Sequence, residues 1–285
     1  MSATANRQHG FVATNGLHLH YVRQGQGPLM LFLHGFPEFW YSWRHQLDYF
    51  AQRYTCVALD LRGYNDSDKP AGVAAYRLPQ LIEDVRGVIQ ALGDGPAILV
   101  GHDWGGAIAW AFAYAHPQLL QSLIILNIPH PAKFAAGLRT PQQLLKSWYI
   151  GVFQLPLLPE LLLQANHHWL IEQILRGVAI DKAAFSSADL QAYKTAAAKP
   201  GALTAMVNYY RAIIQSPGPQ TWGMLEVPTL MIWGEDDVAL GKELTYGTEA
   251  YVRHLQLHYI PHCSHWVQQE QPHQVNALID EFLHP

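Results

Sequence analysis

The sequence has few cysteines, few charged side chains and no long apolar run. Its two cysteines, Cys56 and Cys263, are too few for a disulfide framework, so a reducing compartment is the simpler interpretation. The first ten residues lack the charged start and apolar run of a signal peptide. The apolar stretch 155–163 is interrupted by prolines and is far shorter than the roughly 20 residues that a membrane span needs. We therefore expect a cytoplasmic protein with no membrane span.

Charge is low overall and slightly negative. Charged residues make up 14% of the 285 residues and apolar residues 49%, which excludes a disordered, highly solvated chain. The net charge of −4 gives no basic footprint for nucleic acid or an anionic membrane. The sixteen histidines are scattered, and neither His167-His168 nor the pair His262 and His265 has a recognisable metal-ligand spacing. We expect a globular protein without metal or cofactor.

Short apolar runs alternate with longer amphipathic runs, which is typical of an α/β fold. Asn15-Gly16, between two alternating runs, predicts a hairpin with a type I′ turn. Runs apolar on both faces predict a mostly parallel sheet covered by helices. The predicted central strands are 29–33, 56–59, 97–100, 123–126, 229–233 and 255–260. The predicted flanking helices are 78–92, 107–114 and 267–283.

The alternation lapses between residues 129 and 219. This stretch holds helix-compatible runs, with proline-rich joints between them, at 144–153, 161–175, 190–198 and 203–214. We interpret it as a helical lid inserted between two strands of one sheet. The predicted organisation is therefore an α/β core from 1–128 and 220–285, with a lid from 129–219.

The motif that carries most chemical information is Gly101-His102-Asp103-Trp104-Gly105, between a predicted strand and a predicted helix. A small-x-nucleophile-x-small turn lifts its middle side chain above the sheet edge, and glycines allow the close approach of strand and helix. Lipases and esterases have serine in the middle, whereas this chain has Asp103. A carboxylate suits attack on saturated carbon with formation of an alkyl ester on the enzyme. The alternative interpretation of Asp103 is a plain helix N-cap.

Hydrolysis of such an ester needs a base to activate water and an acid to orient that base. Asp237 follows the strand after the lid, and His265 follows the last strand. Spacing favours these two, with Asp236 and Glu235 as alternative acids and His262 as the alternative base.

The loop His34-Gly35-Phe36-Pro37 follows the predicted strand 29–33. In an α/β fold with a nucleophile turn, this loop donates the backbone N–H of Phe36 to an oxyanion hole, and Trp104 donates the other. A tight turn of this kind can hold the Phe36–Pro37 bond in the cis form. A simple strand-ending turn is the alternative.

With these motifs the chain resembles the aspartate-nucleophile branch of the α/β-hydrolase family, and the epoxide hydrolases within it. The resemblance covers nearly the whole length and rests on residues 34–38, 60–70 and 101–106 and on the Asp237 and His265 loops. It implies two lid tyrosines that hydrogen-bond the epoxide oxygen, Tyr149 in 147–154 and Tyr210 in 208–211. A phenol lowers the barrier because a strained ether leaves poorly as an alkoxide.

Neighbouring residues on a helix point about 100° apart, so one of Tyr209 and Tyr210 faces the cleft. The alternative for a lid tyrosine is a structural role, in which its ring packs in the protein and its hydroxyl is hydrated. The residues expected to contact substrate are His34, Pro37, Trp104, Trp148, Tyr209 and Trp266.

The expected reaction converts a small apolar epoxide and water to a vicinal diol. A haloalkane or haloacetate dehalogenase is the nearest alternative, because Trp104 could donate its indole N–H to halide. Fluoroacetate dehalogenases, however, have arginines just after the nucleophile, absent here, and a lid His-Trp pair where this chain has Tyr149-Ile150. A ligand-sensing receptor on the same scaffold is the alternative of another class. The sequence leaves a monomer and a homodimer equally open.

Overall fold

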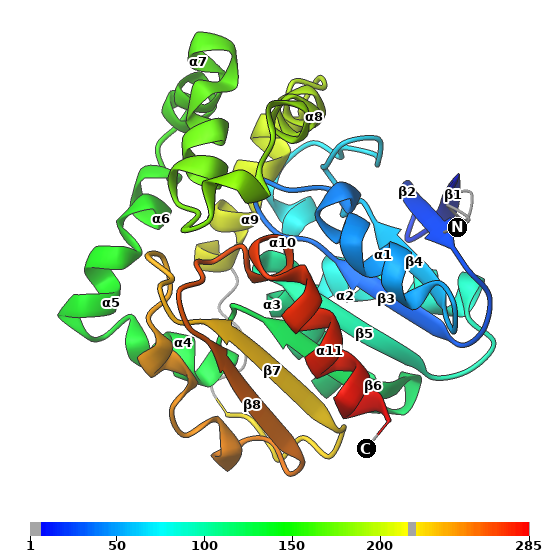
Figure 1. The fold of residues 1–285 in the computed structure, drawn as a ribbon. Helices are drawn as coiled ribbons and strands as arrows, with labels where there is room; N and C mark the ends of the chain where they lie inside the picture. Colours follow the sequence, from blue (N-terminus) through cyan, green and yellow to red (C-terminus); the bar gives the residue numbers. More distant parts are fainter. Residues whose placement is uncertain (1–6, 216–220, 285) are drawn as a thin grey trace.

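A computed structural model describes residues 7–215 and 221–284, and its eight strands form one sheet (Figure 1). The strand order is β1-β2-β4-β3-β5-β6-β7-β8. The pairs β1–β2 and β2–β4 are antiparallel, and the other five are parallel. The predicted mostly parallel sheet is confirmed. The strands are β1 (Gln8–Thr14), β2 (Leu17–Gln24), β3 (Leu29–Leu33), β4 (Thr55–Leu59), β5 (Ala97–His102), β6 (Leu120–Leu126), β7 (Thr229–Gly234) and β8 (Leu255–Ile260).

The N-terminal hairpin joins β1 to β2 through two residues with left-handed backbone. Asn15 has φ 50° and Gly16 has φ 74°, and Thr14 pairs with Leu17 directly beside the turn. A type I′ turn requires positive φ at both central positions, which Asn and Gly tolerate best. The hairpin predicted from Asn15-Gly16 is confirmed.

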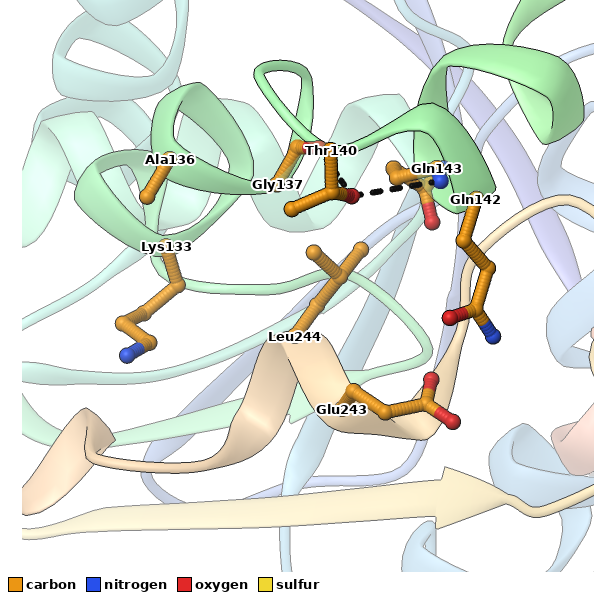
Figure 2. Close-up of a pocket in the computed structure, with 8 residues that line it drawn as sticks. All are labelled: Lys133, Ala136, Gly137, Thr140, Gln142, Gln143, Glu243 and Leu244. Carbon is orange, nitrogen blue, oxygen red and sulfur yellow. Dashed lines mark hydrogen bonds between the residues drawn. The ribbon is translucent and has the colours of Figure 1, made fainter.

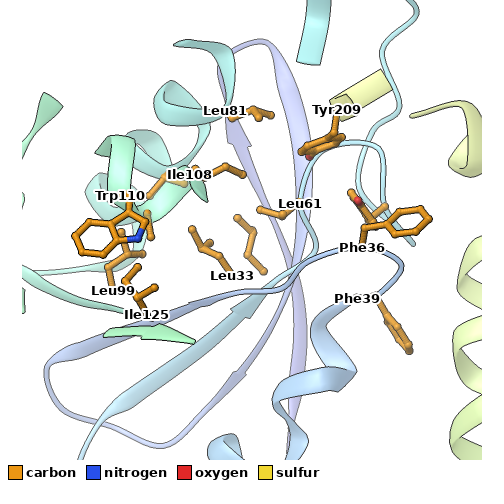
Figure 3. Close-up of a cluster of buried hydrophobic side chains, with 14 of the residues drawn as sticks. Leu33, Phe36, Phe39, Leu61, Leu81, Leu99, Ile108, Trp110, Ile125 and Tyr209 are labelled. Carbon is orange, nitrogen blue, oxygen red and sulfur yellow. The ribbon is translucent and has the colours of Figure 1, made fainter. Parts of the chain in front are cut away.

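Helices cover both faces of the sheet because its central strands are buried on both sides. Along β3, Leu31 and Leu33 belong to one hydrophobic cluster, and Met30 and Phe32 belong to the other. Figure 1 shows the helices of one face, α1 (Arg44–Phe50), α10 (Val267–Glu270) and α11 (Pro272–Leu283). The opposite face carries α2 (Leu78–Leu92) and α3 (Trp104–Ala115). The cluster on the α2/α3 side continues past the end of the sheet to Phe36, Phe39 and Tyr209 (Figure 3).

The described helices between β6 and β7, which we call the lid, lie over the carboxyl ends of the parallel strands (Figure 1). Residues 216–220, which include the predicted lid end at 219, lie outside the described residues, so that boundary stays a prediction. The lid helices are α4 (Pro131–Gly137), α5 (Pro141–Lys146), α6 (Trp148–Val152), α7 (Leu158–Glu172), α8 (Ser187–Ala197) and α9 (Ala202–Gln215).

Three helices predicted as continuous are divided. The predicted 144–153 breaks at Ser147, whose hydroxyl accepts a hydrogen bond from Gln143 (2.9 Å). The predicted 161–175 is interrupted by non-helical backbone at residues 165–168 and then continues as a π turn. The predicted 267–283 breaks at Gln271, since a residue before proline is disfavoured from helical geometry.

None of the helices within residues 7–215 and 221–284 combines the length and the apolar composition needed to cross a bilayer.

Candidate active site

Asp103 lies at the sharp turn between β5 and α3. Its backbone has φ 47° and ψ −122°, an unusual conformation for a residue with a side chain. The turn needs glycine on both sides. A Cβ on Gly105 would lie 2.1 Å from the carbonyl oxygen of Leu33, and one on Gly101 would lie 2.6 Å from that of Gly105. The strained turn presents the carboxylate above the sheet edge, as the motif predicts.

His265 lies beside this carboxylate and is held by Asp237. The Nδ1 of His265 is 2.6 Å from Asp237 Oδ2, and its Nε2 is 3.6 Å from Asp103 Oδ2. The structure therefore brings together Asp103, His265 and Asp237, the three residues expected to act as nucleophile, base and acid. His262, the alternative base, has a side chain 93% exposed, and Asp236 faces that residue at 4.0 Å.

Electrostatics couple the histidine to both carboxylates. Burial would lower the pKa of His265, but the charge of Asp237 and the neighbouring Asp103 carboxylate outweigh it and raise that pKa well above its ordinary value. Burial opposes ionisation of Asp237, yet the charge and hydrogen bond of His265, assisted by Asn127, leave the pKa of Asp237 lowered. The favoured state is an imidazolium between two carboxylates.

The Phe36 loop provides a backbone donor. Phe36 N–H donates to Asp103 Oδ1 at 2.8 Å, and the Phe36–Pro37 bond is cis. Trp104, whose N–H was expected to be the second donor, is the first residue of α3. One donor to the carboxylate is thus already in place.

The two predicted lid tyrosines lie together near the carboxylate. Tyr149 and Tyr210 have ring centroids 5.9 Å apart, and the Tyr210 ring is 5.1 Å from that of Trp104. Burial, followed by the charge of Asp103, raises the pKa of both phenols, so both remain O–H donors at neutral pH. Tyr209 points elsewhere and donates its hydroxyl to the carbonyl of Arg62 (2.8 Å). Of the adjacent pair, Tyr210 faces Asp103.

Other predicted substrate contacts are placed differently. His34 is fully buried, with Nε2 accepting from Leu61 N–H (3.1 Å) and Nδ1 2.9 Å from the carbonyl of Gly35. Trp266 packs its ring against His265 at 4.9 Å and donates its indole N–H to the carbonyl of Ile174. Trp148 is 67% exposed. His34 and Tyr209 are thus bonded to backbone groups and Trp148 faces solvent. Contact of these three residues with substrate stays a prediction.

Both the sequence and the fold are similar to those of known proteins. Residues 28–272 match the family model of the alpha/beta hydrolase fold. The chain belongs to the α/β-hydrolase family. This α/β hydrolase is 42% identical to epoxide hydrolase 4 of Mus musculus over 280 residues, covering 95% of this chain and 78% of the relative. It is 44% identical to the AB hydrolase superfamily protein YfhM of Bacillus subtilis, covering 96% of each. The solved structure of Bacillus megaterium epoxide hydrolase with an inhibitor superposes with a TM-score of 0.92 at 37% identity, covering 97% of this chain and 100% of that one.

The loop that contains Asp237, here called the acid loop, is also held by Asn127, a residue that the sequence did not reveal. Asn127 follows β6, donates to Asp237 Oδ2 at 2.9 Å and accepts from Gly234 N–H. Asp237 further accepts from the N–H groups of Ala239 and Leu240. A polar residue directly after an apolar strand was the available clue to Asn127.

The lid holds the same acid loop from outside. Gln143 on α5 donates to the carbonyl of Ala239 and accepts from Gly241 N–H, while Lys146 donates to the carbonyl of Asp237. Figure 2 shows Gln143 at the wall of a surface depression of about 250 Å³ between α4, α5 and the 3-10 turn at residues 242–245. The lining residues do not include Asp103, so the depression is separate from the site.

A buried ion pair lies behind the nucleophile turn. His102 Nδ1 is 2.8 Å from Glu38 Oε2, and its Nε2 is 2.8 Å from the carbonyl oxygen of His265. Burial would raise the pKa of Glu38, but the charge of His102 and the hydrogen bonds to it and to Gly35 lower it to about 2. The ring of His102 therefore connects the Glu38 carboxylate to the backbone of the loop that contains His265.

Glu270 links the histidine loop to the lid. Its Oε1 accepts from the N–H and the hydroxyl of Ser264, and its Oε2 accepts from the N–H groups of Ile180 (2.7 Å) and Asp181 (2.8 Å). The carboxylate is 5% exposed. Lid backbone and the residue before His265 therefore share one acceptor.

In the part of the chain that the structure describes, one group of potential metal ligands has its atoms within 4.8 Å of one another: His20, Asp60 and Asp66. His20 Nδ1 is 2.6 Å from Asp60 Oδ2, and Asp66 forms an ion pair with Lys199. Their polar atoms already bond to protein partners, so pairing within the protein explains this group.

Proposed function

We propose that this α/β hydrolase converts an epoxide to a vicinal diol through an ester on Asp103. The observation that carries the proposal is a carboxylate in a nucleophile turn, facing two protonated tyrosines on one side and a histidine paired with Asp237 on the other. Relatives named epoxide hydrolase support the activity on epoxides, whereas the ester on Asp103 rests on the geometry.

In the first step, Asp103 attacks an epoxide carbon and the carbon–oxygen bond of the strained ring breaks. Charge develops on the departing oxygen, which must be stabilised in the transition state. Tyr149 and Tyr210 are placed to donate to it, because both phenols keep their protons at neutral pH. The oxygen remains on the substrate as the first hydroxyl of the diol.

In the second step, water attacks the ester carbonyl and the bond between the carbonyl carbon and the ester oxygen on the substrate breaks. The diol leaves with its second hydroxyl, and the Asp103 carboxylate is restored. Esterification removes the charge of Asp103, one of the two carboxylates that raise the pKa of His265. The histidine then loses its proton more readily and acts as general base, still oriented by Asp237. Phe36 N–H already contacts Asp103 Oδ1 and is placed to stabilise the oxyanion that forms there.

The surroundings of Asp103 favour an apolar substrate. Aromatic rings enclose the approach to the carboxylate, with Phe36 and Phe153 packed at 5.5 and 4.8 Å from Tyr210 and with Trp104 on a third side. Apart from the Tyr210 hydroxyl and the Trp104 indole N–H, these side chains present apolar surface. An epoxide with an apolar substituent meets these requirements.

The test is the intact mass of His265→Gln after incubation with epoxides and, separately, with haloalkanes. The variant keeps the nucleophile but lacks the base, so we expect it to accumulate the whole mass of the epoxide on the peptide holding Asp103. The matched control is His262→Gln, which changes an exposed histidine three residues earlier and should turn over without an adduct.

Adducts from haloalkanes alone, which add the mass of the haloalkane less that of HX, would identify a dehalogenase instead. No adduct from either panel would refute nucleophilic attack by Asp103 and favour a receptor. Diol formation by Asp103→Ala at the normal rate would also refute the scheme.

A further inference from the structure

The start of α7 exposes leucines that a soluble helix would normally bury. Leu155, Leu157, Leu158, Leu161 and Leu162 are all exposed, with Leu157 at 72% and Leu161 at 62%. We call these five residues the leucine wedge. Leu158, Leu161 and Leu162 have the i, i+3, i+4 spacing that places side chains on one helix face. That face of α7 is apolar and points outward.

The charge in this segment is turned inward. Glu160 is the only charged residue from 147 to 171, its side chain is 14% exposed, and both of its oxygens bond to Arg211 (2.7 and 3.1 Å). An ordinary surface helix has the opposite arrangement, with charges outside and leucines inside. The inverted pattern neutralises the one charge and leaves the outer face of the wedge apolar.

The tip of the wedge is stiff. Leu157 has φ 64°, a left-handed conformation that is unfavourable for leucine, and prolines at 156 and 159 restrict the backbone on both sides. Asn or Gly would fit this turn better than leucine. Packing within the chain does not explain the leucine, since its side chain is mostly in solvent.

The wedge is connected to the active site. Arg211 donates to the carbonyls of Phe153 and Leu155, and Gln154 donates to the carbonyl of Tyr210. Phe153 packs its ring 4.8 Å from that of Tyr210. Phe153, beside Tyr210, is therefore linked to the backbone of the wedge through Arg211.

The charge of the lid indicates what covers the wedge. Residues 129–219 hold eight Lys and Arg against four Asp and Glu, whereas the rest of the chain holds ten against eighteen. The overall charge of −4, from which we expected no affinity for an anionic membrane, hides a lid with an excess of four positive charges. Two lids packed face to face would bring like charges together, whereas an anionic lipid surface attracts them.

The lid also offers neighbours suited to a lipid interface. Leu144, Leu145 and Trp148 are 59%, 74% and 67% exposed. Tryptophan beside exposed leucines is typical of segments that lie in the headgroup region of a bilayer. Figure 1 shows α5, α6 and α7 along one side of the lid.

We propose that the leucine wedge docks the lid on an anionic lipid surface. The wedge inserts its leucines among the acyl chains without spanning the bilayer, and the basic lid contacts the headgroups. Docking in this way does not depend on the proposed epoxide chemistry. If that chemistry also holds, the docked enzyme would take an apolar epoxide directly from the lipid.

The experiment is flotation of the full chain with vesicles of phosphatidylcholine, with and without phosphatidylglycerol. We expect binding to the anionic vesicles, weaker binding to the neutral ones, and weakening by salt. Leu157→Asn should reduce the partition coefficient about tenfold because a buried leucine is lost, and Leu157→Asn with Leu161→Gln should reduce it further. Leu157→Asn relieves the left-handed strain, so it should leave the thermal midpoint equal or higher. Phe11→Asn, at a residue 59% exposed on β1, is the control and should bind like the wild type.

Three results would overturn the proposal. They are absence of flotation with either vesicle, equal flotation of the wedge variants and the wild type, and a dimer in light scattering that the wedge variants convert to monomer. The last would assign the wedge to a second copy of the chain. Hydrolysis of a water-soluble epoxide, measured without vesicles, tests the proposed chemistry separately and should not change in the wedge variants.

Discussion

Replacing Glu270 by glutamine tests whether one buried carboxylate holds the histidine loop against the lid. The carboxylate accepts four hydrogen bonds, two from Ser264 and one each from Ile180 and Asp181. The single oxygen of glutamine can accept either from Ser264 or from the N–H groups of Ile180 and Asp181. The NH₂ group of the same side chain then faces the other pair of donors. At least one backbone N–H therefore loses its acceptor, and the remaining hydrogen bonds are no longer made to a charged group. With bonds to a charged acceptor worth about 1.5–3 kcal/mol each, we expect Glu270→Gln to lower the free energy of unfolding by about 3 kcal/mol.

The assay is urea denaturation with linear extrapolation, combined with steady-state kinetics on an epoxide. We expect kcat to fall more than KM rises, since Ser264 directly precedes His265. Glu172→Gln makes the same change in a half-buried ion pair with Lys194 and should shift stability by no more than about 1 kcal/mol. Equal losses in the two variants, or an unchanged Glu270→Gln, would refute the reasoning.

Three further predictions follow from the site. Tyr210→Phe should slow ester formation by about one to three orders of magnitude in stopped-flow experiments. Tyr209→Phe, the control, should lower the free energy of unfolding by about 1 kcal/mol and leave the rate of ester formation within a few-fold of the wild type. Equal rates in the two variants would mean that Tyr210 does not donate to the epoxide oxygen. The raised pKa of His265 means that the free enzyme holds this proton above pH 6.5, whereas its ester form releases it at lower pH. Rapid-quench rates should therefore show ester hydrolysis rising with pH through a pKa below that measured for His265 by NMR in the free enzyme, and coincident values would contradict the switch. Gly105→Ala should destabilise by about 1–3 kcal/mol or more because its Cβ meets a backbone oxygen at 2.1 Å, whereas Gly151→Ala, with open space around it, should not lower the thermal midpoint.

The elements predicted well are those whose cause is local. The strands β3 to β7 contain short apolar runs that end at glycine or a polar residue, and the Asn15-Gly16 hairpin depends on two adjacent residues. The run 255–260, predicted as a central strand, instead forms β8 at the edge of the sheet and is only partly buried. The Asp103 turn follows from glycine spacing over five positions. In these cases neighbouring residues contain the whole reason for the structure.

The parts that sequence reasoning missed depend on contacts between distant residues. Asn127 bonds to a carboxylate 110 positions away, and Glu270 bonds to lid backbone 90 positions away. In the sequence alone, Asn127 is an ordinary polar residue after a strand and Glu270 is an ordinary charged residue within a helix. The choice between Tyr209 and Tyr210 had the same difficulty, because helical periodicity separates the two directions without saying which one faces Asp103.

Each part of the proposed catalytic set other than the nucleophile depends on the lid. Gln143 and Lys146 of the lid hold the loop of Asp237, Glu270 ties the loop of His265 to lid backbone, and Tyr210 is itself a lid residue on α9. A movement of the lid as one body would therefore disturb the acid, the base and the phenol together. Because the nucleophile Asp103 is positioned by glycines of the core instead, such a movement would impair both steps while leaving the nucleophile turn intact. A lid substitution far from the reacting atoms, such as Lys146→Ala, should consequently reduce ester formation and ester hydrolysis in similar proportion if the lid moves as one body. A loss confined to hydrolysis would show that the contact between Lys146 and the Asp237 loop acts only on its own loop.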